Sequence, residues 1–265
     1  MKSYLRIFVI KNLMQLQTDL AYRVETAFML LTTTVTLSTT VILYSLLFTQ
    51  VKTVGDWTLN GLLYLLALGN IAISLYTMFS WGSIYHQFRP AVKSGGLDYF
   101  LLKPKSTYFL LSTGRFDFSG LTRFIPSLFL LIYLTVVRPV SPSLLQVIIF
   151  LFVCLTGILL LHLTIFTFYS LSFWTTSTDY FHHFAWAVIG ATTMPLTVFP
   201  EVVYWLFSTV FPVAYASVIP VRLITGLEPI SGLFIVKIIL VPAIYIFILR
   251  TVWSKGLRRY GGASA

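Results

Sequence analysis

Charged residues are scarce in this sequence, and acidic residues are the scarcest of them. Only 10% of the residues are charged, with eight Asp and Glu residues in all, whereas an average soluble domain carries about 25%. Hydrophobic residues make up 57% of the chain, and the mean hydropathy is +0.88. This composition excludes an ordinary soluble domain and indicates a polytopic membrane protein, whose fold is set by the bilayer.

Cysteine and the common catalytic motifs are also missing. The single cysteine, Cys154, lies in an apolar run and is expected to pack, so no disulfide framework exists. The sequence contains no phosphate-binding loop of the form G-x-x-x-x-G-K-[ST], and neither H-E-x-x-H nor G-x-S-x-G occurs. We therefore expect a chain that is not an enzyme, with no catalytic residue, bound cofactor or metal ion, and with no ATP site of its own.

Six apolar runs are long enough to form transmembrane helices, which need about 20 residues to cross a bilayer. The predicted spans are residues 26–48, 61–82, 119–137, 144–172, 181–199 and 231–252. The sequence thus predicts an all-α polytopic membrane protein, in which residues 1–265 form a single transmembrane domain.

Two further segments are apolar but are not predicted to span the membrane. Residues 2–22 place apolar side chains along one side of a moderately amphipathic helix, which predicts an N-terminal helix lying in the cytoplasmic interface. Residues 201–229 hold a short apolar stretch between Glu201 and Pro212, and further prolines interrupt the residues after Pro212. Because such a stretch is too short to cross, we expect an external re-entrant segment before the last span.

Basic residues flank the predicted spans mainly on one side. With the N-terminus in the cytoplasm, Lys237 lies in the outer third of the last span, and the external basic residues are Lys52, Arg138 and Arg222. The rest of the 18 Lys and Arg residues, Arg123 among them, are predicted to be cytoplasmic. The positive-inside rule then places both termini in the cytoplasm, and it assigns the net charge of +10 to topology rather than to nucleic-acid binding.

Residues 83–115 form the longest polar interruption between spans. Apolar spacing predicts a helix at its start, Gly95-Gly96 is expected to end that helix, and Asp98 is expected to cap a second short helix, which ends at Pro104. On the residues alone, a solvated basic loop that fixes topology is the simpler interpretation. A docking surface is the alternative.

Polar side chains at helical spacing occur inside the predicted spans. One face of the second span carries Asn70, Ser74, Thr77 and Trp81. This face must meet protein or water, so a transport path and an interhelical seam both stay open. The first span is rich in threonine, for which close helix packing is the simpler interpretation and substrate lining the alternative. Lys237 is a further path-lining candidate, although its ammonium group can also extend to the outer headgroups.

Histidines provide two weaker signals. Asp179, His182 and His183 have the spacing of metal ligands on one helical face, but a solvated helix end is the simpler interpretation. His162 stands alone in the fourth predicted span and is expected to hydrogen-bond a neighbouring helix.

Taken together, the chain resembles the membrane-spanning subunit of ABC-2 type transporters, in the ABC transport permease subgroup. The most specific match is GGLDYFLLKP, Gly95–Pro104, which resembles the subgroup's G-x-L-D-x-x-L-L-K-P loop. Tyr99 and Phe100 make this copy more aromatic than a generic solvated loop. Weaker matches are Leu20–Arg23, Trp57–Leu62, Phe199–Pro200 and Trp253–Tyr260.

The resemblance implies more than composition does. It implies that a second permease, identical or different, pairs with this chain in the lipid bilayer, that substrate passes between the two, usually outward, and that ATP is bound by a separate ABC ATPase subunit. It implies a bacterial plasma (inner) membrane location. The residues expected to couple to the ATPase are Gly95, Gly96, Leu97, Asp98, Leu101, Leu102, Lys103 and Pro104.

Two other classes of function compete with this interpretation. A secondary transporter would use Lys237 and the broken segment for ion coupling, but the sequence shows no half-to-half repeat and few buried acids. A membrane-embedded enzyme acting on lipids would use His162 or His182. The substrate is not indicated by the sequence.

Overall fold

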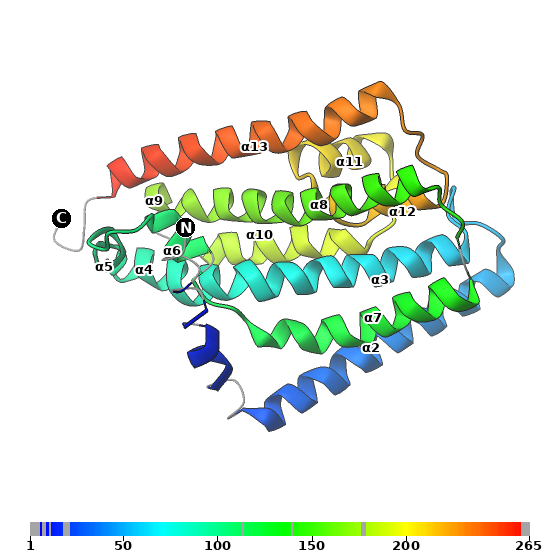
Figure 1. Ribbon diagram of the computed structural model, residues 1–265, viewed down its shortest axis with the longest axis horizontal. Coiled ribbons are helices and arrows are strands. Elements are labelled where there is room, and N and C mark those ends of the chain that lie inside the picture. Colours follow the sequence, from blue (N-terminus) through cyan, green and yellow to red (C-terminus); the bar gives the residue numbers. More distant parts are fainter. Residues whose placement is uncertain are drawn as a thin grey trace.

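The chain folds as helices joined by short loops, in a computed structural model that describes residues 6, 9–10, 12–17, 22–112, 114–138, 140–175 and 179–260. Figure 1 shows the long helices running side by side along the longest axis of the molecule. The predicted all-α architecture is confirmed for this part of the chain.

Five helices in the described ranges are long and apolar enough to cross a membrane. Each of the five corresponds to one of the predicted spans. They are α2 (Arg23–Gln50), Leu59–Lys93 (which runs from α3, Leu59–Tyr76, to α4, Arg89–Lys93), Phe118–Val137 (with α7, Leu121–Val137), Leu144–Thr175 (with α8, Leu144–Ser170, and α9, Ser172–Thr175) and α13 (Gly232–Arg259).

Side-chain caps explain where three of these helices begin. The Thr58 hydroxyl accepts a hydrogen bond from the Gly61 amide at the start of α3 (3.3 Å). Ser143 and Gln146 form a reciprocal capping box at α8, and Ser231 caps α13. Such hydroxyl caps bind amides that have no partner within the first helical turn.

The predicted fifth span, 181–199, is shorter in the structure. Helix α10 (Asp179–Gly190) ends nine residues early and is followed by 3-10 turns at Ala191–Thr193 and Leu196–Val198. Pro195 lies between the two turns and has no N–H to continue a helix. The α-helical part rises about 18 Å, less than the ~30 Å of a bilayer core.

Residues 201–229 form short helical pieces. Helix α11 (Glu201–Trp205) continues as a π-helical turn to Val210, and Val213–Ala216 and α12 (Val218–Ile224) follow Pro212. The Gln146 side chain of α8 donates to the Leu223 carbonyl (3.3 Å), which attaches α12 to the bundle. The break at Pro212 agrees with the expected short pieces, while their position outside the membrane stays a prediction.

The order of the helices across the bundle is α2, α7, α3, α8, α13 (Figure 1). Helix α3 lies in the centre, where 78% of the residues in its most apolar stretch are buried. Helix α2 is at one edge and has no buried residue, and α13 is at the opposite edge. The face of α2 that turns away from α7 is therefore uncovered within one chain.

The predicted span 61–82 and the helix predicted at the start of residues 83–115 are one continuous helix in the structure. The helix continues from Leu59 to Lys93, with π-helical turns at Thr77–Trp81 and Ile84–Phe88. The polar interruption 83–115 thus begins as an extension of the span and then forms α5 (Leu97–Leu101) and α6 (Thr107–Ser112). The sequence periodicity identified both helical stretches. It did not show that they are continuous, because polar residues follow the end of the apolar run.

The predicted interfacial helix 2–22 falls mostly outside the described residues. Residues 12–17 are helical, and the Asn12 side chain accepts a hydrogen bond from the Phe116 amide (2.7 Å). This contact joins the N-terminal segment to the residues that lead into α7.

Candidate functional site

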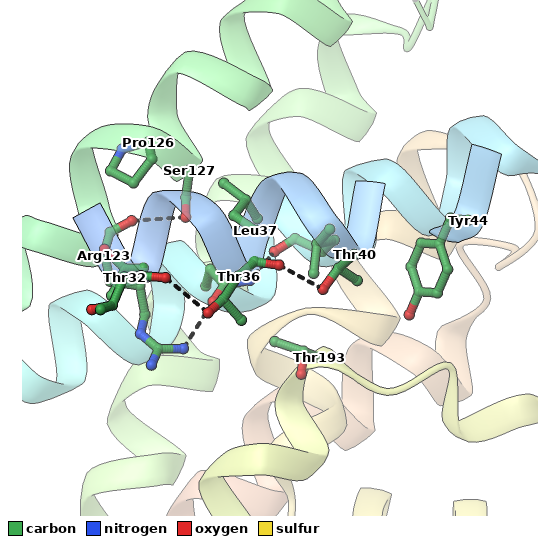
Figure 2. A pocket seen from close by; sticks show the side chains of 12 residues that line it. Thr32, Thr36, Leu37, Thr40, Tyr44, Arg123, Pro126, Ser127 and Thr193 are labelled. Atoms are coloured by element: carbon green, nitrogen blue, oxygen red, sulfur yellow. Dashed lines mark hydrogen bonds between the residues drawn. The ribbon is translucent and has the colours of Figure 1, made fainter. Parts of the chain in front are cut away.

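A polar cavity of about 400 Å³ lies between α2, α3 and α7 (Figure 2). One wall is a threonine face of α2, which contributes Thr32, Thr33, Thr36 and Thr40. The opposite walls contribute Asn70 from α3, Arg123 and Ser127 from α7, and Thr193 from the turn after α10. The cavity therefore gathers polar groups from four segments that are distant in sequence.

Close backbone contact brings Thr193 to this cavity. Gly69 of α3 faces the turn, and a Cβ atom at this position would lie 2.7 Å from the Thr192 carbonyl oxygen. Only a residue without a side chain allows the turn to approach so closely. As a result, Thr193 and Asn70 border the same cavity.

The cation in this cavity is Arg123. Its Nη1 donates to the Asn70 side-chain oxygen (3.0 Å), and the Asn70 amide in turn donates to the Leu66 carbonyl (2.8 Å). Figure 2 shows the guanidinium extending from α7 into the space bordered by α2 and Thr193. No Asp or Glu lines the cavity in the described part of the chain.

Arg123 was predicted to be one of the cytoplasmic basic residues, and its position relative to the membrane stays a prediction. Its partner Asn70 lies about 17 Å along α3 from Leu59 at 1.5 Å per residue. The Thr33 hydroxyl, which donates to the Thr122 carbonyl (2.7 Å), lies about 15 Å along α2 from Arg23. The Arg123 side chain therefore lies against the middle parts of α2 and α3.

A smaller hollow of about 180 Å³ continues on the other side of Arg123. Ser74 and Thr77 of the long α3 helix line it, and so does Trp186 of α10. The predicted stripe Asn70, Ser74 and Thr77 thus borders two hollows that share Arg123 in their linings, instead of an interhelical seam alone. That these hollows form a transport path stays a proposal.

The threonines of α2 combine both interpretations made for them. Thr33 binds α7 through the Thr122 carbonyl, which is a packing role. Thr36 and Thr40 donate to carbonyls of their own helix and still border the cavity. A hydroxyl whose proton is already donated presents oxygen lone pairs to the hollow.

Lys237 does not belong to this site. It lies on the exposed face of α13, at the edge of the bundle opposite α2 (Figure 1). The structure therefore brings together three of the four residues predicted to line a path and leaves Lys237 apart. Its exposed position fits the alternative in which a lysine extends along the lipid surface.

The segment Gly95–Pro104 lies at the end of the long helix. The Tyr260 hydroxyl, just past α13, donates to the Gly95 carbonyl (2.7 Å), and Leu97 is fully buried. Burial and the nearby Asp98 carboxylate raise the pKa of Tyr260, so its proton remains available for this bond. The C-terminal end of the described chain thus holds the segment in place.

The outer side of the same segment is apolar and open. Leu101 is 43% exposed and Leu102 is 86% exposed. The Lys103 ammonium lies 3.7 Å from the centre of the Tyr99 ring, a cation–π contact that orders the turn after α5. Exposed leucines on an ordered turn are an unusual feature unless another surface covers them.

One detail predicted for this segment is wrong. Gly96, not Asp98, is the N-cap of α5, and no side chain caps the helix; Asp98 is exposed in the first turn. Its charge can still interact with the helix dipole. The pair Gly95-Gly96 follows the end of α4 as predicted, and Gly95 has the left-handed backbone, with φ of 72°.

The histidines take structural positions in the described chain. His162 is buried, and its Nε2 atom hydrogen-bonds the Tyr108 hydroxyl of α6 (2.8 Å), as expected for a contact between helices. His182 packs against Trp81 and Tyr85. Among described residues no group of three potential metal ligands occurs, and the Asp179 side chain lies outside them.

A second arginine, Arg222 of α12, has different partners. Its guanidinium bonds the carboxylates of Asp56 and Glu228, the latter at 3.3 Å. Burial alone would raise the pKa of Asp56, but Arg222 and the Thr197 hydroxyl outweigh it and hold the pKa below its usual value. This cluster ties the loop between α2 and α3 to α12, and no local sequence pattern indicates the pairing.

Comparison with known proteins supplies the class of this bundle. A family model described as ABC-2 family transporter protein matches residues 34–264, from the threonine face of α2 to beyond α13. Searches of curated proteins and of solved structures each found no match. The matched region covers most of the chain and contains the segment Gly95–Pro104, all of the cavity lining except Thr32 and Thr33, and all five long helices at least in part. The chain therefore belongs to the ABC-2 family of transporter proteins.

Proposed function

We propose that this chain is the non-catalytic permease subunit of an ATP-driven ABC-2 exporter, coupled to a separate ABC ATPase. Family membership gives the class of protein. The lack of a phosphate-binding loop supports an ATPase located on another chain. The observation that carries the coupling is the exposed pair Leu101 and Leu102 on a turn held by Tyr260 and by buried Leu97.

The coupling segment, Gly95–Pro104, has the properties that force transmission requires. Leu102 offers an apolar contact to a partner, while the buried Leu97 and the Gly95–Tyr260 bond fix the segment to the bundle. Because α4 continues the membrane helix, a push that reaches Lys93 is carried along one continuous helix into the membrane interior. The ATPase subunit would therefore contact residues that are mechanically connected to Asn70.

The translocation path in this proposal includes the cavity around Arg123. Helix α2 forms its outer wall and has no buried residue in the single chain. A second permease packed on this uncovered helix would close the cavity and convert it into a path between subunits. Pairing with an identical or a different permease satisfies this requirement equally.

The topology of the proposal keeps both termini in the cytoplasm. Moving Arg123 into the membrane leaves the charge asymmetry in place, because the remaining external basic residues are still Lys52, Arg138 and Arg222. The same topology requires the segment from α10 to Leu196–Val198 to act as a sixth crossing. Reporter fusions at Asp56 and after Tyr260 should report outside and inside, respectively.

Co-purification of the full chain with ABC ATPase subunits from its own cells in mild detergent tests the function. Leu102→Asp should lower ATPase recovery and transport, because it places a charge in an apolar contact. Lys105→Gln, a charge change in the neighbouring turn, is the matched control and should do much less. Normal ATPase recovery and transport with Leu102→Asp would refute coupling through this segment.

A further inference from the structure

Arg123 is the charged group of the cavity lining and has hydrogen-bond donors to spare. A guanidinium carries five N–H donors, and in the described chain Arg123 uses one of them, on Asn70. The neighbouring hydroxyls of Thr36, Thr40 and Ser127 already donate to backbone carbonyls. The group that still requires partners is therefore a cation, and its natural partner is an anion.

The surroundings of Arg123 exclude a cationic ligand. No carboxylate lines either of the two hollows that Arg123 borders, within the residues described. The nearest acid in sequence, Asp117, accepts a bond from the Ser119 amide (3.0 Å) and belongs to neither lining. A charge between transmembrane helices is costly without a counter-ion, and such a residue is therefore a candidate for function.

Next to the polar cavity lies an apolar groove of about 650 Å³ between α2 and α7. Its walls include Val41, Ile125 and Phe129, and it shares Leu37 and Pro126 with the cavity. The shared residues show that the two hollows adjoin. A polar chamber with one cation thus borders a hydrocarbon-lined groove.

We propose that this site binds an amphiphile with a single anionic headgroup, a phosphate or a carboxylate, and a hydrocarbon chain. The headgroup accepts hydrogen bonds from the free N–H groups of Arg123. The chain lies past Leu37 and Pro126 in the groove. The inference rests on the proposed transport function, because it names the substrate class of the same cavity.

Volume and charge agree with this class of ligand. A space of about 400 Å³ accommodates a small headgroup, and one guanidinium neutralises one anionic group. Longer polyanions would meet no second cation among the described residues of either lining. The apolar groove gives the rest of the ligand a surface that a soluble anion does not need.

Binding to the purified full chain in neutral maltoside micelles tests the proposal. The probes are dodecyl phosphate, dodecanoate, inorganic phosphate and dodecyltrimethylammonium, and the measurements are the thermal midpoint and tryptophan fluorescence, since Trp186 lines the smaller hollow. We expect the two anionic amphiphiles to bind. Arg123→Gln should weaken their binding at least about tenfold, or ~1.4 kcal/mol.

Arg138 provides a matched control. It lies at the other end of α7 and donates to Asn60 of α3 (2.8 Å), the same arginine–asparagine pairing outside the cavity. Arg138→Gln should leave binding unchanged, and Arg123→Lys should retain part of it. If Arg123→Gln fails to fold, Arg123→Lys and Asn70→Leu, judged by size-exclusion profile, keep the comparison available.

Three outcomes would overturn the proposal. They are equal binding by wild type and a folded Arg123→Gln variant, equal binding of the cationic amphiphile, and inorganic phosphate binding as tightly as dodecyl phosphate. The last would indicate a free anion site. Because these measurements need no ATPase, loss of binding with intact ATPase association would refute the substrate class alone. Failed association with intact binding would refute the coupling proposal alone.

Discussion

Two largely buried arginines, Arg123 and Arg222, solve the problem of a charge inside a membrane protein in different ways. Arg222 bonds two carboxylates, Asp56 and Glu228, and a backbone carbonyl. Arg123 bonds one neutral amide oxygen and faces a hollow without any acid in the described chain. Arg222 therefore has the partners of a structural residue, whereas Arg123 keeps N–H donors from which a ligand can accept hydrogen bonds.

The difference indicates which arginine is retained for stability. A buried charge loses its hydration, and the loss is offset only when good counter-ions are present. Arg222 has them within its own chain. Arg123 lacks them, so its presence costs folding energy that a purely structural site would avoid. Charge complementarity thus separates the two sites, although both residues are arginines flanked by apolar segments.

Replacing Arg222 should produce the largest loss of stability. Arg222→Met leaves Asp56 and Glu228 close together without a cation, and we expect a loss of about 2 kcal/mol, below that of a fully buried pair because the Asp56 side chain is 39% exposed. Unfolding in mixed micelles measures it. An unchanged unfolding midpoint would contradict the structural role.

Replacing Arg123 by a residue of similar length should have a small effect on stability. Arg123→Met removes a charge without a counter-ion, so the change in unfolding free energy should stay within about 1 kcal/mol and can be favourable. The same variant should lose binding of dodecyl phosphate. A destabilisation as large as that of Arg222→Met would remove the contrast between the two sites.

Acid should weaken the Arg222 site and leave the Arg123 site unchanged. The pKa of Asp56 is held below its usual value in the folded chain. Its ion pair therefore contributes fully above the ordinary aspartate pKa and is lost as the pH falls through the lowered one. The stability gap between wild type and Asp56→Asn should be constant near neutral pH and close in acid. The gap for Arg123→Met should stay constant, and unfolding curves across this range test both.

The smallest effect is expected from the cavity hydroxyls. Thr36→Val removes a neutral hydroxyl whose proton is already donated to Thr32, so it should change the binding of anionic amphiphiles by at most about fivefold, the equivalent of ~1 kcal/mol. Thr39→Val, on a residue of α2 that lines neither the cavity nor the groove, is the control and should not change their binding. A loss with Thr36→Val as large as that with Arg123→Gln would mean that the cation is not the main contact.

Much of the fold was predictable from the sequence because apolar runs and prolines are local signals. Five predicted spans appear as long helices, and the breaks at Pro200 and Pro212 were expected. The length of α10 was not, because residues 181–199 are apolar enough for a span while Pro195 ends the regular helix. Hydropathy counts residues, but it does not register a single missing N–H.

The candidate site was only partly predictable. Asn70, Ser74 and Thr77 were identified because their spacing puts them on one helical face. Arg123 was counted with the cytoplasmic residues although it lies inside the predicted span 119–137, and that position was the available signal. The carboxylates that pair with Arg222, and their absence at Arg123 in the described chain, depend on contacts between segments far apart in sequence, which no local pattern encodes.

In the proposed coupling, the uninterrupted helix from Leu59 to Lys93 would act as a lever. Asn70 and Lys93, which is two residues before the coupling segment, lie about 35 Å apart on it at 1.5 Å per residue. A tilt of about 5° at one end would displace the other by roughly 3 Å over that length, enough to break the contact between Asn70 and Arg123. The wider π-helical turns at Thr77–Trp81 and Ile84–Phe88 lie between these two residues. The stiffness of the helix at these turns would determine how much of a movement of the coupling segment reaches Asn70.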